Sequence, residues 1–370
     1  MRFFLSQLFL TTLIFPGGSS AVAQAPAPSP AAPAAPEVAF DAKQAEAAVT
    51  ELAKALEENF VFPDAGNSYA AMLRANLAKG AYASFPSATA FAERVTADLL
   101  AVHKDGHLRL RPVTAEMGAR RGGPRSGPGG ADASTVTRSG WLAPGIAYID
   151  FAAFLGNKAT TDEVTKFLAD HRGAETLIID ARGNRGGGLD EMNLIFREIY
   201  AKPTTLVTMD IRQAVEGKHG TPFGEDPTLR KIAGPASVIR REHFVTPTAT
   251  PGPLAKAKVY LLTSKKTFSA AEHLSLSLKR TGRATLVGEA TGGGAHFGGM
   301  VPMGEGYAAF IPVGRTFDPT TGNSWEGTGV APDVAVPADQ ALAKALELAG
   351  AKVDAATALA KLGPARLSAR

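Results

Sequence analysis

The segment TLIIDARGNRGGG, residues 176–188, joins an apolar run to a glycine-rich turn, and the helical pattern LDEMNLIFREIY follows directly. A short apolar run that ends in glycines and gives way to a helix is typical of a buried strand entering a βα turn. The same order returns at KVYLLT, residues 258–263, which leads through a basic turn into a helix beginning near Ser269. Strands that alternate with helices predict an α/β domain with parallel strand pairing.

Further elements are predicted on both sides of this segment. Apolar residues at helical spacing from Asp41 to about His103 predict a bundle of three helices, the last with Ser87 as its N-cap. A turn at Asp105-Gly106 then feeds a strand. Downstream, the patterns predict strands and helices at GIAYIDF (145–151), Glu163 to His171, ATLVGE (284–289), YAAFIPV (307–313) and ADQALAKALELAG (338–350).

Composition describes an ordinary globular chain. It has 370 residues, of which 45% are hydrophobic and 20% charged, and a net charge of +4. This length fits about two domains, and so small an excess of charge does not imply a nucleic-acid partner. The stretch between Arg111 and Gly140 is rich in Gly, Arg and Pro, but it has no interleaved aromatic residues for stacking on RNA, so a surface loop is favoured.

Cysteine is absent from the sequence. Disulfides, thiol nucleophiles and thiolate metal sites are therefore excluded. The histidines lack the spacing of known metal motifs, so no metal and no cofactor is expected.

The first 23 residues predict a secretory signal peptide. Arg2 precedes an apolar run from Phe3 to Phe15, and small residues end the segment at Ala23. The run is short for a membrane span, so no stable span is expected after cleavage; an uncleaved anchor is the alternative. The Pro/Ala-rich residues 24–40 predict an exposed linker, and the expected location is periplasmic or secreted.

TFSAAE, residues 267–272, raises the question of what Ser269 does. A serine before a helix is commonly just an N-cap. Free N–H groups and the helix dipole also favour negative charge there, so Ser269 is a candidate nucleophile with the Ala270 N–H as an oxyanion donor. The glycine turn at 183–188 suits a phosphate, an oxyanion or a plain turn; it matches neither phosphate-binding fingerprint, and G-x-S-x-G is missing from the chain.

A serine nucleophile requires a base that takes its proton. His107, in a DGH turn where the helical region meets the α/β region, is the strongest candidate, and His103 and His273 are weaker ones. Glu326, in NSWEGTGVAPD, is suited to orient a histidine.

Three stretches together resemble the C-terminal processing (tail-specific) protease and tricorn family of serine peptidases. They are DARGNRGGG, the segment from VYLLTSKKTFSAAEHL to VGEATGGG, and NSWEGTGVAPDVAV, and the resemblance spans roughly His103 to Val336. It implies a ClpP/crotonase-like β-β-α spiral core and a serine nucleophile at Ser269. It also implies oxyanion donors at the N–H of Ala270 and at that of Gly186 or Gly187.

The family has two catalytic schemes. Processing proteases use a lysine 25 residues after the serine, and the residue here is Gly294; Lys279 and Lys265 are poorly placed to replace it. The tricorn-like branch uses Ser, His and Glu, which Ser269, His107 and Glu326 match. Tricorn has a serine just before its histidine, where this chain has Gly106, so the coupling between His107 and Glu326 is in question.

About 30 residues separate His107 from the GIAYIDF strand, too few for the PDZ domain of processing proteases. The chain is therefore similar to a compact branch that includes the repeats of interphotoreceptor retinoid-binding protein. The expected division is a signal peptide at 1–23, a linker at 24–40, a helical bundle at 41–104, a peptidase core at 105–350 and a C-terminal tail at 351–370.

The hypothesis that follows is an exported serine peptidase acting on peptides or proteins through an acyl-enzyme. The alternative is a binding protein for apolar ligands or peptides on the same fold. Acyl-CoA chemistry, also known for crotonase-like folds, fits an exported chain poorly. Substrate specificity depends on loops such as Arg212 to Val245, and neither it nor the oligomeric state is predicted.

Overall fold

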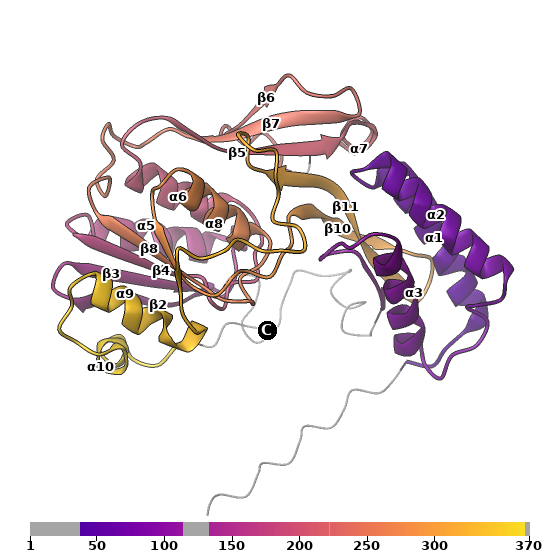
Figure 1. Cartoon of the computed structure of the whole chain (residues 1–370), viewed down its shortest axis with the longest axis horizontal. Helices are drawn as coiled ribbons and strands as arrows, with labels where there is room; N and C mark the ends of the chain where they lie inside the picture. The colour runs from indigo at the N-terminus through magenta and orange to yellow at the C-terminus, as the bar shows by residue number, and fades with distance from the viewer. Residues whose placement is uncertain (1–37, 114–132, 222, 367–370) are drawn as a thin grey trace, which may run out of the picture. The chain divides into compact units, whose positions relative to one another are not determined.

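Two six-stranded sheets and three groups of helices make up the described part of the chain (Figure 1). The computed structural model describes residues 38–113, 133–221 and 223–366. The predicted signal peptide, most of the linker and residues 114–132 of the predicted surface loop lie outside these ranges. The described residues belong to one compact unit.

The first sheet is the predicted parallel one. Its strand order is β12-β9-β8-β4-β3-β2, with every pair parallel except β2 with β3. The strands are β2 (Val136–Ala143), β3 (Ile146–Phe151), β4 (Thr176–Asp180), β8 (Lys258–Thr263), β9 (Thr285–Gly288) and β12 (Val334–Ala335).

Helices cover both faces of this sheet, which explains why its central strands are apolar throughout. On β4, Leu177 and Ile179 join the core under α5 (Lys158–Asp170), α6 (Asp190–Ile199) and α8 (Ala270–Arg280). Ile178 faces the opposite side and packs with α9 (Ala341–Leu348), which follows a 3₁₀ turn at Ala338–Gln340. Within the predicted tail, α10 (Ala355–Ala360) contributes the buried Ala358 to that second core.

The second sheet is antiparallel, and sequence patterns did not predict most of it. Its order is β1-β11-β5-β7-β6, and β10 pairs with the other edge of β11. The strands are β1 (Arg109–Pro112), β5 (Thr204–Arg212), β6 (Leu229–Ile232), β7 (Val238–Val245), β10 (His296–Pro302) and β11 (Tyr307–Phe317), and the short α7 (Gln213–His219) follows β5.

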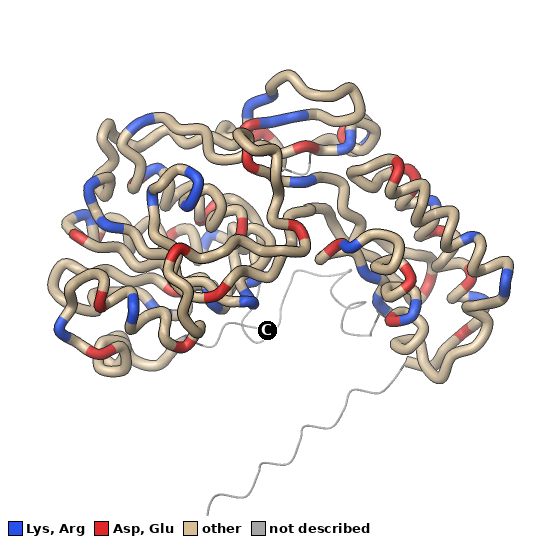
Figure 2. The backbone as a smooth tube through the Cα atoms, viewed as in Figure 1, with Lys and Arg blue, Asp and Glu red and all other residues tan. Residues whose placement is uncertain are grey.

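Charged side chains run through the part of this sheet built by β5 and β7. Figure 2 marks both basic and acidic residues there, and Arg240 and Arg315 both pair with the buried Asp210. Arg241 pairs with Glu216 of α7. The segment from Arg212 to Val245, predicted as a loop, therefore contains α7, β6 and β7, and these ion pairs explain how so polar a stretch forms part of a sheet.

The predicted helical bundle is present as α1 (Ala42–Asn59), α2 (Pro63–Ala78) and α3 (Ala88–Val102). Ser87 caps α3, as predicted, because its hydroxyl accepts the N–H of Ala90. The helices share one hydrophobic core with Tyr307, Ala309 and Ile311 of β11. No helix within the described ranges is both long and apolar enough to cross a bilayer.

Truncating Leu52 tests whether this shared core couples the helices to the sheet. Leu52 of α1 is fully buried, so Leu52→Ala is expected to lower the free energy of unfolding by about 3 kcal/mol. Chemical denaturation should still show one transition, because the helices and β11 share a core. Leu100→Ala is the matched control, since Leu100 is 37% exposed on α3 and should change stability little. A separate transition for the helices would contradict the coupling.

Candidate active site

Ser269 lies between β8 and α8 in a strained turn. Its backbone has φ 55° and ψ −118°, the only positive φ of a non-glycine residue in the described ranges. Such a conformation costs about 1–3 kcal/mol and persists only where the surroundings impose it. Strain of this kind is typical of functional sites, and it separates Ser269 from an ordinary N-cap serine, which has extended backbone.

The carboxylate of Glu272 holds this turn in place. Glu272 is fully buried and accepts four hydrogen bonds, from the N–H of Ser269 (2.8 Å), Gly293 (2.7 Å) and Gly294 (2.8 Å) and from the hydroxyl of Thr291 (2.6 Å). Burial raises the pKa of Glu272, and the four donors oppose that effect. The start of α8 and the glycine loop after β9 are therefore joined through one side chain.

The glycine turn at 183–188 lies directly against Ser269. A Cβ on Gly186 would fall 2.7 Å from the Ser269 Cβ and 2.8 Å from the Ala270 nitrogen, so only glycine fits there. The two loops are also hydrogen-bonded, because the Phe268 N–H donates to the carbonyl of Asn184 and the Thr267 hydroxyl donates to that of Ala181.

The two candidate glycines differ in what their N–H groups do. Gly186 N–H donates to the side chain of Asn184 at 2.8 Å and is already used. The backbone N–H of Phe154 donates to the carbonyl of Gly186, and the carbonyl of Phe154 accepts from the N–H of Gly188. The N–H of Gly187, between these two bonds, therefore faces away from Phe154. No partner for the N–H of Gly187 or Ala270 is found among the described residues. Both residues line the same cavity as Ser269.

His107 packs against Phe268, the residue that precedes Ser269. Its ring is tilted against Phe268 and stacked on Phe310, with centroid distances of 4.6 and 5.0 Å. Burial lowers the pKa of His107 to about 4; nearby Asp105 opposes this shift, while Arg109 and His296 add to it. The imidazole is therefore neutral at pH 7. Its Nδ1 is buried and has no hydrogen-bond partner in the described part of the chain.

Gly294, the position of the family's lysine, lies against the His107 ring. A Cβ at this position would come within 2.7 Å of His107 Cε1 and 2.3 Å of Phe268 Cζ. Both contacts are closer than real Cβ atoms reach. The His107 ring can therefore occupy this position only because residue 294 is glycine.

Glu326 is hydrogen-bonded to the backbone beside His107. It accepts from the N–H of Gly106 (2.6 Å), Ala295 (2.6 Å) and His296 (3.1 Å). Among the described residues, no hydrogen bond joins its carboxylate to the His107 ring. A Cβ on Gly106 would come 2.9 Å from the carbonyl oxygen of Gly293, so a serine there would be crowded. The contact with Glu326 runs through the Gly106 backbone.

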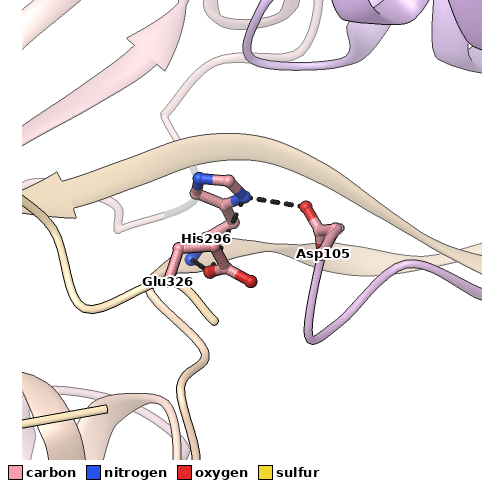
Figure 3. Close-up of side chains that lie close together, drawn as sticks. All are labelled: Asp105, His296 and Glu326. Atoms are coloured by element: carbon pink, nitrogen blue, oxygen red, sulfur yellow. Dashed lines mark hydrogen bonds and ion pairs between the residues drawn. The ribbon is translucent and has the colours of Figure 1, made fainter. Parts of the chain in front are cut away.

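Asp105 and His296 complete this network, as Figure 3 shows. The Asp105 carboxylate accepts from the N–H of His107 (2.8 Å) and Leu108 (2.9 Å), and it bonds His296 Nδ1 at 2.7 Å. Burial raises the pKa of Asp105, but the contact with His296 and the two N–H groups outweigh burial and leave the pKa below its ordinary value. The DGH turn is therefore held by two carboxylates.

Three side chains of this network lie close enough together to share a metal ion. Asp105, His296 and Glu326 place potential ligand atoms within 4.8 Å of one another, and imidazole with carboxylates suits Zn²⁺. However, the Glu326 oxygens already accept three N–H groups, and Asp105 Oδ1 accepts two. Donors pointed at the carboxylates disfavour a cation, so we assign no metal here.

The weaker candidates are engaged elsewhere. His103 ends α3, and its carbonyl accepts from the Tyr69 hydroxyl. His273 is buried in α8 and hydrogen-bonds His243. Lys279 pairs with Asp333 at 3.0 Å, and Lys265 lines a separate open groove.

Sequence reasoning missed Glu272, Asp105 and His296. The spacing of Ser269 and Glu272 matches a capping box, a signal that could have identified Glu272. Asp105 in DGH forms an Asx turn, in which its side chain accepts the N–H of His107 two residues later, and an aspartate before glycine is a second local signal. His296 follows GGGA with no local pattern that marks it.

The helical layer, the two sheets and the serine-bearing turn after β8 define a class of α/β fold seen in processing proteases. The photosystem II D1 C-terminal processing protease superposes with a TM-score of 0.51 at 16% identity, covering 80% of this chain and 94% of that one. A putative peptidase from Parabacteroides merdae gives 0.51 at 17%, covering 86% and 96%. Tricorn protease gives 0.50 at 13%, covering 86% of this chain but 36% of its own.

Sequence models of families agree with the fold. The model described as peptidase family S41 matches residues 145–336, more than half of the chain. The model described as the N-terminal domain of Peptidase_S41 in eukaryotic IRBP matches residues 33–128. The chain therefore belongs to peptidase family S41. The predicted resemblance and the predicted α/β fold class with an N-terminal helical bundle are confirmed.

Adding one methyl group at Gly294 tests how tightly His107 is held. Gly294→Ala should displace the His107 ring and slow any reaction that depends on it by at least about tenfold, because a 1 Å misplacement in an active site is costly. The rate of labelling by a fluorophosphonate probe measures the effect. Gly299→Ala is the matched control, since a Cβ there meets nothing within 4 Å. Equal labelling rates in the two variants would contradict the role of Gly294.

Proposed function

We propose that this protein is an exported serine peptidase that hydrolyses peptide bonds through an acyl-enzyme. The observation that carries the proposal is the strained Ser269 beside two free N–H groups, with a neutral histidine packed against the same loop. The predicted signal peptide at residues 1–23 supports export to the periplasm or the outside of the cell.

In the proposed reaction, His107 takes the proton of Ser269 while the hydroxyl attacks a peptide carbonyl. The N–H groups of Ala270 and Gly187 stabilise the oxyanion, because they carry partial positive charge and have no other partner in the described ranges. Gly186 shapes the turn instead. The amine leaves with the proton from His107, and a water molecule then hydrolyses the acyl-enzyme.

A base that acts through Nε2 must carry its hydrogen on Nδ1, which then needs an acceptor. We propose that Glu326 takes this role when substrate is bound, since it already bonds Gly106, the residue before His107. Catalytic hydrogen bonds are often long or misaligned before substrate binds. Asp105 and His296 act as positioning residues for the DGH turn.

Removing the nucleophile is the direct test. Ser269→Ala should abolish labelling by a fluorophosphonate probe and lower peptide hydrolysis by several orders of magnitude. Thermal unfolding should change little, because alanine keeps the Cβ and with it the same backbone conformation of the turn, and only the hydroxyl is lost. Ser277→Ala on the same helix is the control that should label normally.

Equal labelling of the wild type and Ser269→Ala would contradict the proposal. A protein that takes no label, yet binds an apolar ligand or peptide with unchanged affinity in Ser269→Ala, would instead support the alternative of a binding protein on this fold.

The pH dependence tests His107 as the base. A base must be deprotonated, and the pKa of His107 is lowered to about 4, so the labelling rate should hold from pH 7 to 5 and fall by half near pH 4. His107, His243 and His273 all have lowered pKa values, so below pH 6.5 the unfolded chain binds more protons and folding weakens. Circular dichroism at each pH shows how much of any fall in the labelling rate comes from unfolding and how much from protonation of His107. An acid limb centred near pH 6.5 in folded protein would contradict this assignment.

A further inference from the structure

A chain of buried hydrogen bonds runs from an open groove to the cavity at Ser269. His273 Nε2 and His243 Nδ1 lie 2.8 Å apart, and His243 Nε2 lies 2.8 Å from Asn193 Oδ1. The amide nitrogen of Asn193 faces Thr228 Oγ1 at 3.2 Å and Asp226 Oδ2 at 3.4 Å. The chain joins α8, β7 and α6, and its outer end lines a groove of about 490 Å³.

The outer end fixes which way Asn193 points. The Thr228 hydroxyl donates to Asp226 at 2.6 Å, so its oxygen is left to accept, and a carboxylate also accepts. The Asn193 atom that faces both groups must therefore be the NH₂ nitrogen. Its carbonyl oxygen then faces His243, which must donate from Nε2.

The orientation of Asn193 sets both imidazole tautomers in turn. Burial lowers the pKa of His243 to about 3 and holds that of His273 well below 6.5, so both rings are neutral at pH 7. A neutral His243 with hydrogen on Nε2 has a bare Nδ1, which accepts from His273 Nε2–H. His273 is left with a bare Nδ1, an acceptor that does not readily become a donor.

His273 lines the cavity that holds Ser269, Ala270 and Gly187. Among the described residues, the hydrogen bond of this ring is made by Nε2, so Nδ1 is available to a group that enters the cavity. The cavity is small, about 50 Å³, and its larger side chains are mostly apolar: Leu189, Met209, Phe223, Phe297 and Trp325. Besides Ser269 and His273, its polar side chains are those of Thr316 and His296, and His296 is bonded through Nδ1 to Asp105. A fixed acceptor in an apolar wall favours a hydrogen-bond donor on the ligand.

We propose that this cavity receives the side chain on the acyl side of the scissile bond, and that His273 selects a short hydroxyl side chain, threonine or serine, there. The inference rests on the proposed function, because it places the scissile carbonyl between Ser269 and the N–H groups of Gly187 and Ala270. The hydroxyl donates to His273 Nδ1, and its hydrocarbon part contacts the apolar wall. His273 is thus assigned as a specificity-determining residue.

Two active-site probes that differ by one group test the selection. Diphenyl aminophosphonates with threonine-like and valine-like side chains are nearly the same size, and they differ in a hydroxyl against a methyl. We expect the wild type to react about tenfold faster with the threonine-like probe, a typical effect of one hydrogen bond in an apolar site. A ratio of one or less would overturn the inference.

Variants of the hydrogen-bond chain show whether His273 causes that ratio. His273→Leu should lower it to one or less while the valine-like probe still reacts. His171→Leu is the matched control, because His171 is also buried but lies on α5's C-terminal end, away from the cavity. An unchanged ratio in His273→Leu would overturn the inference.

Asn193 offers a test that leaves the cavity wall intact, in case His273→Leu does not fold. Asn193→Leu removes the acceptor that fixes His243 and should reduce the ratio, whereas Asn193→Gln keeps a neutral amide carbonyl as the acceptor and should retain it. Equal ratios in these two variants would count against the tautomer argument. A fluorophosphonate without a side chain separates the outcomes. If it labels Ser269 normally while the ratio is one, this inference alone fails; if it does not label, the proposed function fails as well.

Discussion

The carboxylate of Glu272 is the constraint on which the rest of the site depends. It joins the start of α8 to the loop after β9 by accepting four hydrogen bonds while fully buried. Burying a charge is costly unless donors surround it, and here three backbone N–H groups and a hydroxyl do so. This arrangement offsets the backbone strain at Ser269, and it fixes Gly294, against which His107 packs. The side chain of Glu272, in the first turn of α8, thus helps to position both Ser269 and His107.

The same device is repeated around His107. Asp105 and Glu326 accept N–H groups from the DGH turn and from the GGGAH segment, and His296 bonds Asp105 between them. Buried carboxylates that collect backbone N–H groups hold irregular loops with the precision of a helix or strand, because each bond is charge-assisted and directional. Three loops without regular structure can therefore present a site that needs close tolerances.

Local patterns predicted the three helices, the parallel strands and the positions of Ser269 and the glycine turn, because each depends on residues within a few positions of one another. The antiparallel sheet escaped prediction, since strands such as β7 alternate arginines with apolar residues and are stabilised by pairing with Asp210 and Glu216 from other elements. The contacts of Glu326 with Gly106 and of His296 with Asp105 span 220 and 191 residues. No local spacing encodes such contacts. Local spacing likewise does not show that the N–H of Gly186 is used by Asn184 whereas no partner for that of Gly187 is found among the described residues.

The geometry at Gly294 bears on how one fold supports two kinds of base. A lysine at 294 would place its Cβ 2.7 Å from His107 Cε1 and 2.3 Å from Phe268 Cζ, closer than either ring allows. The lysine scheme and the histidine scheme are therefore sterically exclusive in this arrangement, although both bases would serve the same serine. A single substitution at 294 would add the stem of a lysine without removing the ring, and loss of His107 alone would leave a gap beside Phe268 without the proposed base. Change from one scheme to the other requires both positions to change together, which is a physical reason for a chain to keep glycine and histidine as a pair.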